Sequence, residues 1–401
     1  MREETQPAYF EGSVSWGRTY MSKKKIVAGV LAVAFASSFL TLAGLSWLLG
    51  FRGSGIDDIA RFALAVHFIE KKYVSAIEPS KLMDGAITGM LQVLGDPHSI
   101  YMGPQLYQQL MDQTEGTFGG IGVYMGFKES KVSVISVMEG SPAEQAGLAA
   151  NDEILAVDGV PVAEIQPGEV AFRIRGEIGT EVKLLVHREG ETDREVSVTR
   201  GEIQLKTAAG QMMEDGIGYI RISSFAENTG VEFSEALTKL EQEGMQGLVI
   251  DLRQNPGGLL TTCVEIADQV VPKGLVVSIV DRDGNKEEYL SELEEERCPM
   301  AVLIDENSAS ASEILAGALQ DREAATIIGT KSYGKGSVQT VVPLFHSDAM
   351  KLTVAKYYTP SGRCIDGVGV KPDIEIPLTE EDTADVQLRK AMEVLKEKTA
   401  K

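Results

Sequence analysis

Residues 300–320 read Met-Ala-Val-Leu-Ile-Asp305-Glu-Asn-Ser308-Ala-Ser310-Ala-Ser-Glu313-Ile-Leu-Ala-Gly-Ala-Leu-Gln320, an apolar strand that runs through a turn of small residues into a helix. A strand, a tight turn and a helix in this order are the building unit of an α/β core. The turn lifts a serine to the amino-terminal end of the helix, where the partial positive charge favours a developing anion. In the simpler alternative, Ser308 or Ser310 only caps the helix.

Strands and helices alternate around this unit, from about Gly216 to Pro377, and predict one α/β domain. The predicted strands are Ile217–Ile222, Gly247–Leu252, Leu275–Val280, Ala301–Ile304 and Ala325–Ile328, and the predicted helices are Thr229–Glu243, Leu260–Val271 and the final amphipathic helix Ala384–Lys398. The second strand leads into Asn255-Pro-Gly-Gly258, where two glycines let the backbone turn its amides inward. A plain turn is the alternative.

A β-rich module precedes this domain and begins near Gly116. Its predicted elements are the strands Val132–Val137 and Ile154–Val157, a two-turn helix at Ser141–Leu148 and a helix at Val170–Ile174. Residues 55–113 show apolar positions at helical spacing and predict helices without chemistry. They are broken by the turn Gly95-Asp-Pro-His98-Ser99, in which His98 is interpreted as a structural residue.

The composition excludes several classes of protein. A formal charge of −21 argues against nucleic acid as a partner, because that affinity rests on clustered Lys and Arg. The cysteines are far apart and odd in number, so no disulfide is expected, and the histidines are scattered without zinc-ligand spacing. These residues are Cys263, Cys298 and Cys364, and His67, His98, His187 and His346. We therefore expect no metal and no cofactor.

The amino-terminal part of the chain predicts a membrane anchor. From Ile26 to Phe51 no residue is charged, and a helix of this length exceeds the roughly 30 Å of bilayer hydrocarbon. Lys23, Lys24 and Lys25 come just before it and predict a cytoplasmic N-terminus. The rest of the chain would then lie on the far side of the membrane. A cleaved signal peptide is the alternative, although its apolar core is usually shorter.

The β-rich module carries four motifs in order: Gly119–Gly122, the run Ser141-Pro-Ala-Glu-Gln-Ala-Gly-Leu148, Asp152-Glu-Ile-Leu155 and Arg175-Gly176. In this order they resemble a PDZ domain of the bacterial protease type. A PDZ domain receives an extended peptide as an added strand and holds its terminal carboxylate with loop amides. The resemblance implies that amides around Gly120, Ile121 and Gly122 bind a polypeptide C-terminus, and that Arg173 or Arg175 senses its arrival.

A glycine-rich loop, Lys331-Ser-Tyr-Gly-Lys335-Gly-Ser-Val-Gln339, follows the strand Ala325–Ile328. A lysine in such a loop is usually solvated or a phosphate ligand, but no nucleotide-binding motif precedes a helix here. With Asp251-Leu-Arg-Gln-Asn-Pro-Gly-Gly258, the serine turn and Tyr358-Thr-Pro-Ser-Gly362, all in family order, the loop resembles the carboxyl-terminal processing peptidases of the S41 class. The resemblance extends over roughly residues 82–377.

The resemblance implies roles for individual residues. Ser310 would be the nucleophile, Lys335 the general base and Gln339 the residue that orients the lysine. The oxyanion hole would be formed by the amides of Ala311 and of Gly257 or Gly258. Asp251 and Arg253 are interpreted as residues that hold the glycine loop rather than react.

The chemistry agrees with this assignment. A serine hydroxyl needs a base to become a nucleophile, and no histidine is well placed to be that base. Lysine must be uncharged for this task, so its pKa has to fall by roughly two to three units from about 10.4. Burial can provide this shift without a counter-ion, and no Asp or Glu lies within ten residues of Lys335 in the sequence.

The predicted fold class is a multidomain α+β protein with a transmembrane helix, a helical arm, a PDZ module and an α/β protease core. The predicted divisions are a cytoplasmic N-terminus (1–25), a transmembrane anchor (26–51), a helical region (55–115), the PDZ domain (116–203), the serine protease core (204–378) and a C-terminal helix (379–401). The family likeness alone suggests a homodimer built by the terminal helices.

The predicted function is that of a single-pass membrane serine endopeptidase, with its catalytic part in the periplasm or cell-envelope space. It would cleave flexible C-terminal regions of proteins that its PDZ domain has captured. One rival is a catalytically silent, membrane-tethered PDZ scaffold that binds protein C-termini. A second rival is a Ser/His hydrolase that uses His98 or His346 as the base.

Overall fold

The computed structural model describes residues 55–128, 131–294, 297–378 and 384–399, together with isolated positions between residues 33 and 44. The chain divides into two compact units, residues 1–86 and 87–401. The predicted membrane span at 26–51 lies outside the described residues, apart from those isolated positions. Among the helices that are described, none combines the length and the apolar character needed to cross a bilayer.

The regular structure described in the first unit is helical. Helix α2 spans Gly55–Lys72, with Asp57 and Asp58 in its first turn and Lys71 and Lys72 in its last. This charge order complements the helix dipole, because acidic groups stabilise the amino-terminal end and basic groups the other. Helix α3, Pro79–Gln92, begins in this unit, and helix α4, Pro104–Glu115, follows in the second. The helices predicted for residues 55–113 are therefore confirmed, with one short strand between α3 and α4.

The β-rich module has its own sheet, of strand order β3-β4-β5-β7-β8 with β6 paired to β5. Its strands are β3 (Val123–Lys128), β4 (Lys131–Val137), β5 (Glu153–Val157), β6 (Val160–Pro161), β7 (Glu181–His187) and β8 (Arg194–Thr199). In β7, Val182, Leu184 and Val186 are buried and alternate with exposed residues, as expected for a sheet with one covered face. Strands β2 (Thr117–Gly120) and β9 (Gly201–Gln204) pair antiparallel at the entry and exit of the module.

The helices of the module differ in length from the prediction. Helix α6, Pro167–Ile174, contains the predicted second helix, and the short helix η1 spans Val162–Glu164. Helix α5 covers only Pro142–Gln145, so the predicted two-turn helix is wrong in length. The Ser141 hydroxyl caps it as expected, but the chain leaves the helix at Ala146 and turns left-handed at Gly147, with φ 78°.

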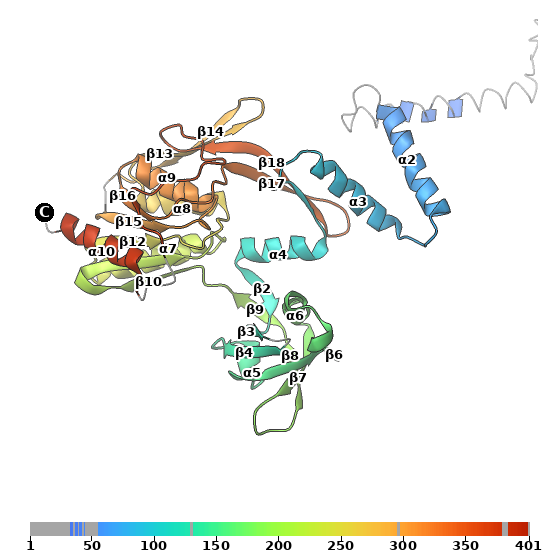
Figure 1. Cartoon of the computed structure of the whole chain (residues 1–401), viewed down its shortest axis with the longest axis horizontal. Coiled ribbons are helices and arrows are strands. Elements are labelled where there is room, and N and C mark those ends of the chain that lie inside the picture. The colour runs from blue at the N-terminus through green and yellow to red at the C-terminus, as the bar shows by residue number, and fades with distance from the viewer. Residues whose placement is uncertain are drawn as a thin grey trace, which may run out of the picture. The chain divides into compact units, whose positions relative to one another are not determined.

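The α/β core is built on a six-stranded sheet of order β10-β11-β12-β15-β16-β19 (Figure 1). Only β10 runs antiparallel to its neighbour. The strands are β10 (Ala208–Met212), β11 (Ile217–Ile222), β12 (Gly247–Asp251), β15 (Met300–Ile304), β16 (Ala325–Gly329) and β19 (Ile374–Glu375), and the helices are η2 (Glu214–Gly216), α7 (Thr229–Gln242), α8 (Leu260–Val270), α9 (Ala311–Asp321) and α10 (Val386–Thr399).

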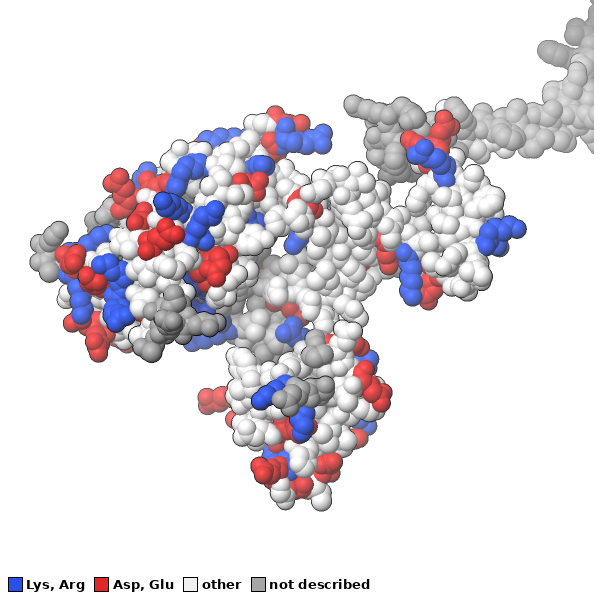
Figure 2. All heavy atoms as spheres, viewed as in Figure 1, with Lys and Arg blue, Asp and Glu red and all other residues white. Residues whose placement is uncertain are grey.

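Both faces of this sheet are covered by helices. Leu248 and Ile250 of β12 lie in the large core cluster with residues of α7, α8 and α9. Val249, between them, points to the other face and packs with Ala391 and Leu395 of α10. The predicted strands and helices of the core are confirmed to within one or two residues at their ends. Figure 2 shows basic and acidic side chains interspersed on the face of the core in view.

A second, antiparallel sheet packs against the same helices. Its order is β1-β18-β13-β14, with β17 also paired to β18. The strands are β1 (Ile100–Met102), β13 (Gly274–Asp281), β14 (Lys286–Ser291), β17 (Ser337–Pro343) and β18 (Ala349–Tyr358). Helix α9 contacts β16 of the first sheet and β13 of the second, and buried Tyr357 of β18 belongs to the same core cluster. This packing brings the end of the lysine loop toward the amino-terminal end of α9.

Candidate active site

The serine turn has a conformation that is unusual for a residue other than glycine. Ser310 joins β15 to α9 with φ 56° and ψ −114°. Such a conformation costs about 1–3 kcal/mol and persists only where the surroundings enforce it. Ser308 and Ser312 are fully buried, and their hydroxyls donate to the carbonyls of Leu252 (2.9 Å) and Asn255 (3.0 Å). Ser310, by contrast, is only half-buried, and it is the N-cap residue of α9.

The carboxyl group of Glu313, in the first turn of α9, ties the serine turn to the lysine loop. It is fully buried and accepts four hydrogen bonds. Oε2 accepts from the amides of Ser310 and Lys335, both at 2.9 Å. Oε1 accepts from the Ser332 hydroxyl at 2.5 Å and from the Gly334 amide at 2.7 Å. Because one oxygen holds both amides, the backbones of Ser310 and Lys335 are close neighbours.

The environment of Lys335 favours the uncharged amine. The side chain is half-buried, and this desolvation, together with the positive charge of Lys351 on β18, lowers the pKa of Lys335 below its ordinary value. Glu313 and Asp96 act in the opposite direction and offset part of the shift. The sequence suggested burial without a nearby acid, whereas the fold brings two acidic residues close from distant parts of the chain. The net direction is nevertheless downward.

Two further side chains bond to residues of the lysine loop, and only the second of them bonds to Lys335 itself. Gln339, predicted to orient the lysine, donates from its amide nitrogen to the Ser337 carbonyl (3.0 Å), the Ser337 hydroxyl (2.8 Å) and the Thr353 hydroxyl (3.5 Å). Tyr357, which sequence reasoning missed, donates its hydroxyl to the Lys335 carbonyl and interacts with the Ser310 side chain. Burial raises the pKa of Tyr357 well above its ordinary value, so the phenol keeps its proton.

The glycine loop lies directly against the serine turn. A Cβ on Gly257, whose φ is 98°, would lie 2.6 Å from the Ala309 carbonyl and 2.8 Å from Ser310 Cβ, so only glycine fits. The Gly257 amide donates to Asn255 Oδ1 at 2.9 Å. Within the described residues, the amides of Gly258 and Ala311 donate to no other group. Of the two glycines predicted for an oxyanion hole, Gly258 therefore has the amide available.

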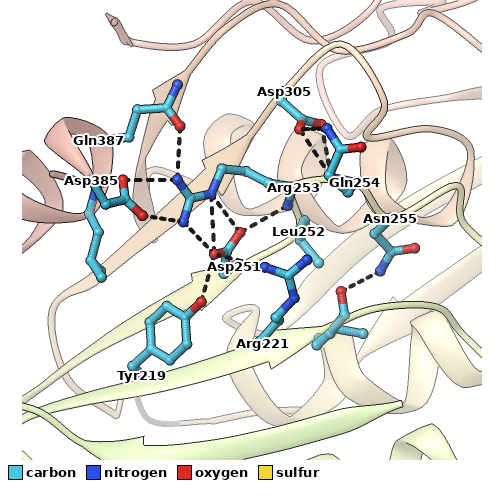
Figure 3. Close-up of polar contacts among 12 residues, drawn as sticks. Tyr219, Arg221, Asp251, Leu252, Arg253, Gln254, Asn255, Asp305, Asp385 and Gln387 are labelled. Carbon is cyan, nitrogen blue, oxygen red and sulfur yellow. Dashed lines mark hydrogen bonds and ion pairs between the residues drawn. The ribbon is translucent and has the colours of Figure 1, made fainter. Parts of the chain in front are cut away.

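An ion-pair network supports the other end of this loop (Figure 3). Asp251 is fully buried, and Arg253 reaches its carboxyl group with Nε at 3.0 Å and with a second nitrogen at 2.6 Å. Tyr219 donates to the same carboxyl at 2.7 Å; burial and the charge of Asp251 raise the pKa of Tyr219 to about 12. Asp251 and Arg253 thus form a buried ion pair, which agrees with the interpretation that they support the glycine loop.

The histidines of the rival assignment lie in turns. The His98 amide donates to Asp96 Oδ1 at 2.9 Å, and Ser99 donates to the other oxygen of the same carboxyl at 2.6 Å. His346 is exposed in the turn between β17 and β18, with φ 68°. Within the described residues, the Ser310 amide donates to Glu313 and the Ser310 side chain interacts with Tyr357, not with either histidine.

The residues predicted to bind or sense a peptide terminus have different surroundings in the structure. Ile121 is buried in the core of the β-rich module, and the Gly122 carbonyl accepts from the Met138 amide at 2.9 Å. Arg173 pairs with Glu169 on the surface of α6, at 2.8 Å. Arg175 turns instead toward α4, where it pairs with Asp112 at 3.4 Å and lies 4.0 Å from the ring centre of Phe118.

Comparison with known proteins agrees with this architecture. A model of peptidase family S41 matches residues 216–376, a PDZ domain model matches residues 133–188, and a model of the N-terminal domain of the activating protease CtpB matches residues 51–105. The chain is 40% identical over 332 residues to the carboxy-terminal processing protease CtpB of Bacillus subtilis (strain 168). The matched residues make up 81% of this chain and 68% of that protein. The chain belongs to the carboxy-terminal processing proteases of peptidase family S41.

A second relative supports the same membership, and a solved structure shares the fold. The carboxy-terminal-processing protease of Bartonella bacilliformis is 38% identical to this S41 protease over 368 residues, 89% of this chain and 84% of the relative. A solved structure from Bacteroides fragilis NCTC 9343 that carries the name S41 protease shares the fold, with a TM-score of 0.50 and 17% identity over 77% of this chain and 90% of that one. The protein is thus a serine-type peptidase with a PDZ domain.

We predict that replacing Glu313 with Gln destabilises this S41 protease by at least about 1–3 kcal/mol, because an amide nitrogen would replace one oxygen and remove the acceptor of two buried donors. Urea unfolding measures the free energy, and the same change at Glu393, on the surface of α10, is the matched control. A Glu313→Gln variant as stable as the Glu393→Gln variant would contradict the assigned hydrogen bonds.

Proposed function

We propose that this S41 protease is a membrane-anchored endopeptidase that cleaves extracytoplasmic proteins near their C-termini with a Ser310/Lys335 dyad. The observation that carries the proposal is the shared Glu313 oxygen, which binds the amides of both residues and keeps their backbones together. The lowered pKa of Lys335 favours the second requirement, an uncharged amine that can accept a proton.

The proposed reaction has two stages, acylation of Ser310 and hydrolysis of the acyl-enzyme. Lys335 Nζ takes the proton of the Ser310 hydroxyl as Oγ attacks the scissile carbonyl carbon. The oxygen of that carbonyl becomes negative and accepts hydrogen bonds from the Ala311 and Gly258 amides, the first of which lies at the amino-terminal end of α9. The carbon–nitrogen bond then breaks, and the leaving amine takes the proton from Lys335. Water, deprotonated by the same amine, attacks the ester carbon; the bond from that carbon to Oγ breaks, Oγ takes the proton back from Lys335, and the carboxylic acid product leaves.

Tyr357 and Gln339 complete this proposed centre. The Tyr357 hydroxyl donates to the Lys335 carbonyl and its oxygen interacts with the Ser310 side chain, so it would hold Ser310 Oγ in place while the Ser310 proton is directed to Lys335 Nζ. Gln339 holds Ser337, two residues beyond the lysine, and would act on Lys335 through the loop backbone. Both side chains would position the reacting groups without exchanging protons with the substrate.

The PDZ domain is proposed to capture the substrate tail. A PDZ domain binds an extended C-terminus along its sheet, with the carboxylate on successive loop amides, here those of Gly120, Ile121 and Gly122. Several relatives are named as carboxy-terminal processing proteases, which agrees with a substrate recognised at its C-terminus. Arg175, rather than Arg173, contacts the segment that leads from α4 into the domain, so it is the better candidate to sense binding.

The membrane anchor remains part of the proposal. Its support is the uncharged segment 26–51 after three lysines, which favours a helix with its N-terminus in the cytoplasm and the protease on the periplasmic or cell-envelope side. A homodimer through the terminal helices is proposed on the family likeness.

Cleavage of a peptide with a flexible, apolar C-terminal tail tests the dyad. We predict that Ser310→Ala and Lys335→Met each lose activity by at least about a thousandfold, while His98→Ala and His346→Ala keep it. In the wild type, kcat/KM should rise with pH, because the base is the neutral amine, and level off below the ordinary pKa of lysine.

The rival functions give different results. Activity that survives Lys335→Met and disappears with a histidine variant would establish a Ser/His hydrolase. A wild-type protein that binds the tail peptide but does not cleave it, at any pH tested, would establish a PDZ scaffold.

Removal of residues 1–51 tests the anchor. We predict that the full chain sediments with membranes and is released by detergent but not by alkaline carbonate, whereas the truncated protein is found in the supernatant. Release of the full chain by carbonate would contradict an integral anchor.

A further inference from the structure

Two residues at the amino-terminal end of helix α10 accept hydrogen bonds from Arg253, which precedes the glycine loop. Arg253 donates to Asp385 with two nitrogens, at 2.7 and 3.0 Å, and to Gln387 Oε1 at 3.0 Å (Figure 3). More than 130 positions separate these partners from Arg253 in the sequence. With Asp251, they surround a guanidinium group whose side chain is only 10% exposed.

Asp385 both binds Arg253 and caps helix α10. Its Oδ1 also accepts from the Leu388 amide at 2.9 Å, so it caps α10. Burial acts to raise the pKa of Asp385, but the hydrogen bonds of Arg253 and of nearby amides outweigh it and lower the pKa, which keeps the carboxylate charged. Gln387 is 1% exposed and is itself fixed, because its amide nitrogen donates to the Ile376 carbonyl at 2.7 Å. Both partners of Arg253 are therefore held in place.

The residues on either side of Arg253 hold the serine turn. The Leu252 carbonyl accepts from the Ser308 hydroxyl at 2.9 Å. The Gln254 amide donates to both carboxyl oxygens of Asp305, at 3.0 and 3.1 Å, and Gln254 adopts a left-handed φ of 61° that this contact supports. The guanidinium group of Arg253 is held by α10, and the residues next to Arg253 in the chain contact the serine turn.

We propose that Asp385 and Gln387 are positioning residues for the reaction at Ser310. They act through Arg253 on the loop that presents the Gly257 and Gly258 backbone to the serine turn. The first turn of the C-terminal helix is in this sense a part of the active-site support. The inference rests on the proposed function of Ser310 and adds a structural requirement to it.

The test separates positioning from simple attachment of the helix. Asp385→Ser keeps a capping hydroxyl for α10 but removes both bonds to Arg253, and Asp385→Asn keeps one acceptor oxygen. Gln387→Met preserves volume and removes the third bond. Lys396→Met is the matched control, since it breaks an ion pair with Asp215 that ties the same helix to the core far from Arg253.

All variants are assayed as the full chain on the tail peptide, at a temperature well below their thermal midpoints. We expect Asp385→Ser and Gln387→Met to lower kcat roughly ten- to a hundredfold while KM changes less than about twofold, because binding remains and the reacting groups are misplaced. Asp385→Asn should lose less than Asp385→Ser. Lys396→Met should keep the wild-type kcat.

Two outcomes overturn the inference. One is a wild-type kcat for Asp385→Ser and Gln387→Met. The other is an equal loss of kcat in Lys396→Met, which would show that weakened attachment of the helix is sufficient. If cleavage persists in Ser310→Ala, the proposed function fails instead, and the two failures are thereby distinguished.

Discussion

The buried carboxyl group of Glu313 is the constraint on which the candidate site depends. Its two oxygens receive four donors, two of them the backbone amides of Ser310 and Lys335. A buried carboxyl without these partners would cost several kcal/mol, so the four donors and the acceptor enforce one another. The same hydrogen bonds hold Ser310 at its positive φ at the start of α9. They also hold the lysine loop, which connects β16 to β17, against that helix end.

This arrangement presents an electrostatic conflict that the fold resolves. A negative charge near Lys335 favours the ammonium form, which cannot act as a base. Glu313 directs its oxygens to amides and a hydroxyl, not to the amine, so its effect on the lysine is limited to its charge. Desolvation and the positive charge of Lys351 act more strongly, and the pKa of Lys335 falls. Glu313 thus supports the backbone of the site, while desolvation and Lys351 lower the pKa of Lys335.

The sequence predicted the six-stranded α/β layer of the core well because strands such as Gly247–Asp251 and helices such as α8 follow simple periodicities. It did not predict the second, antiparallel sheet, to which the predicted strand Leu275–Val280 belongs as part of β13. It also placed Ser310, Lys335 and the glycine loop on turns that the structure brings together. Tyr357, Asp96 and Asp385 were missed, because their roles depend on contacts between segments far apart in the chain. The helix at Ser141–Leu148 was predicted too long, since a cap and a glycine mark the ends of a helix but not where its hydrogen bonds stop.

The protonation of one amine tests the account most directly. Titration of the Lys335 ε-carbon by NMR, in protein with labelled lysines and with the signal assigned by its loss in Lys335→Arg, reports the pKa without any assay of cleavage. The account predicts a midpoint clearly below the value of about 10.4 for a free lysine. A midpoint at or above that value would contradict it, because the amine would then be charged under the conditions in which it must accept a proton.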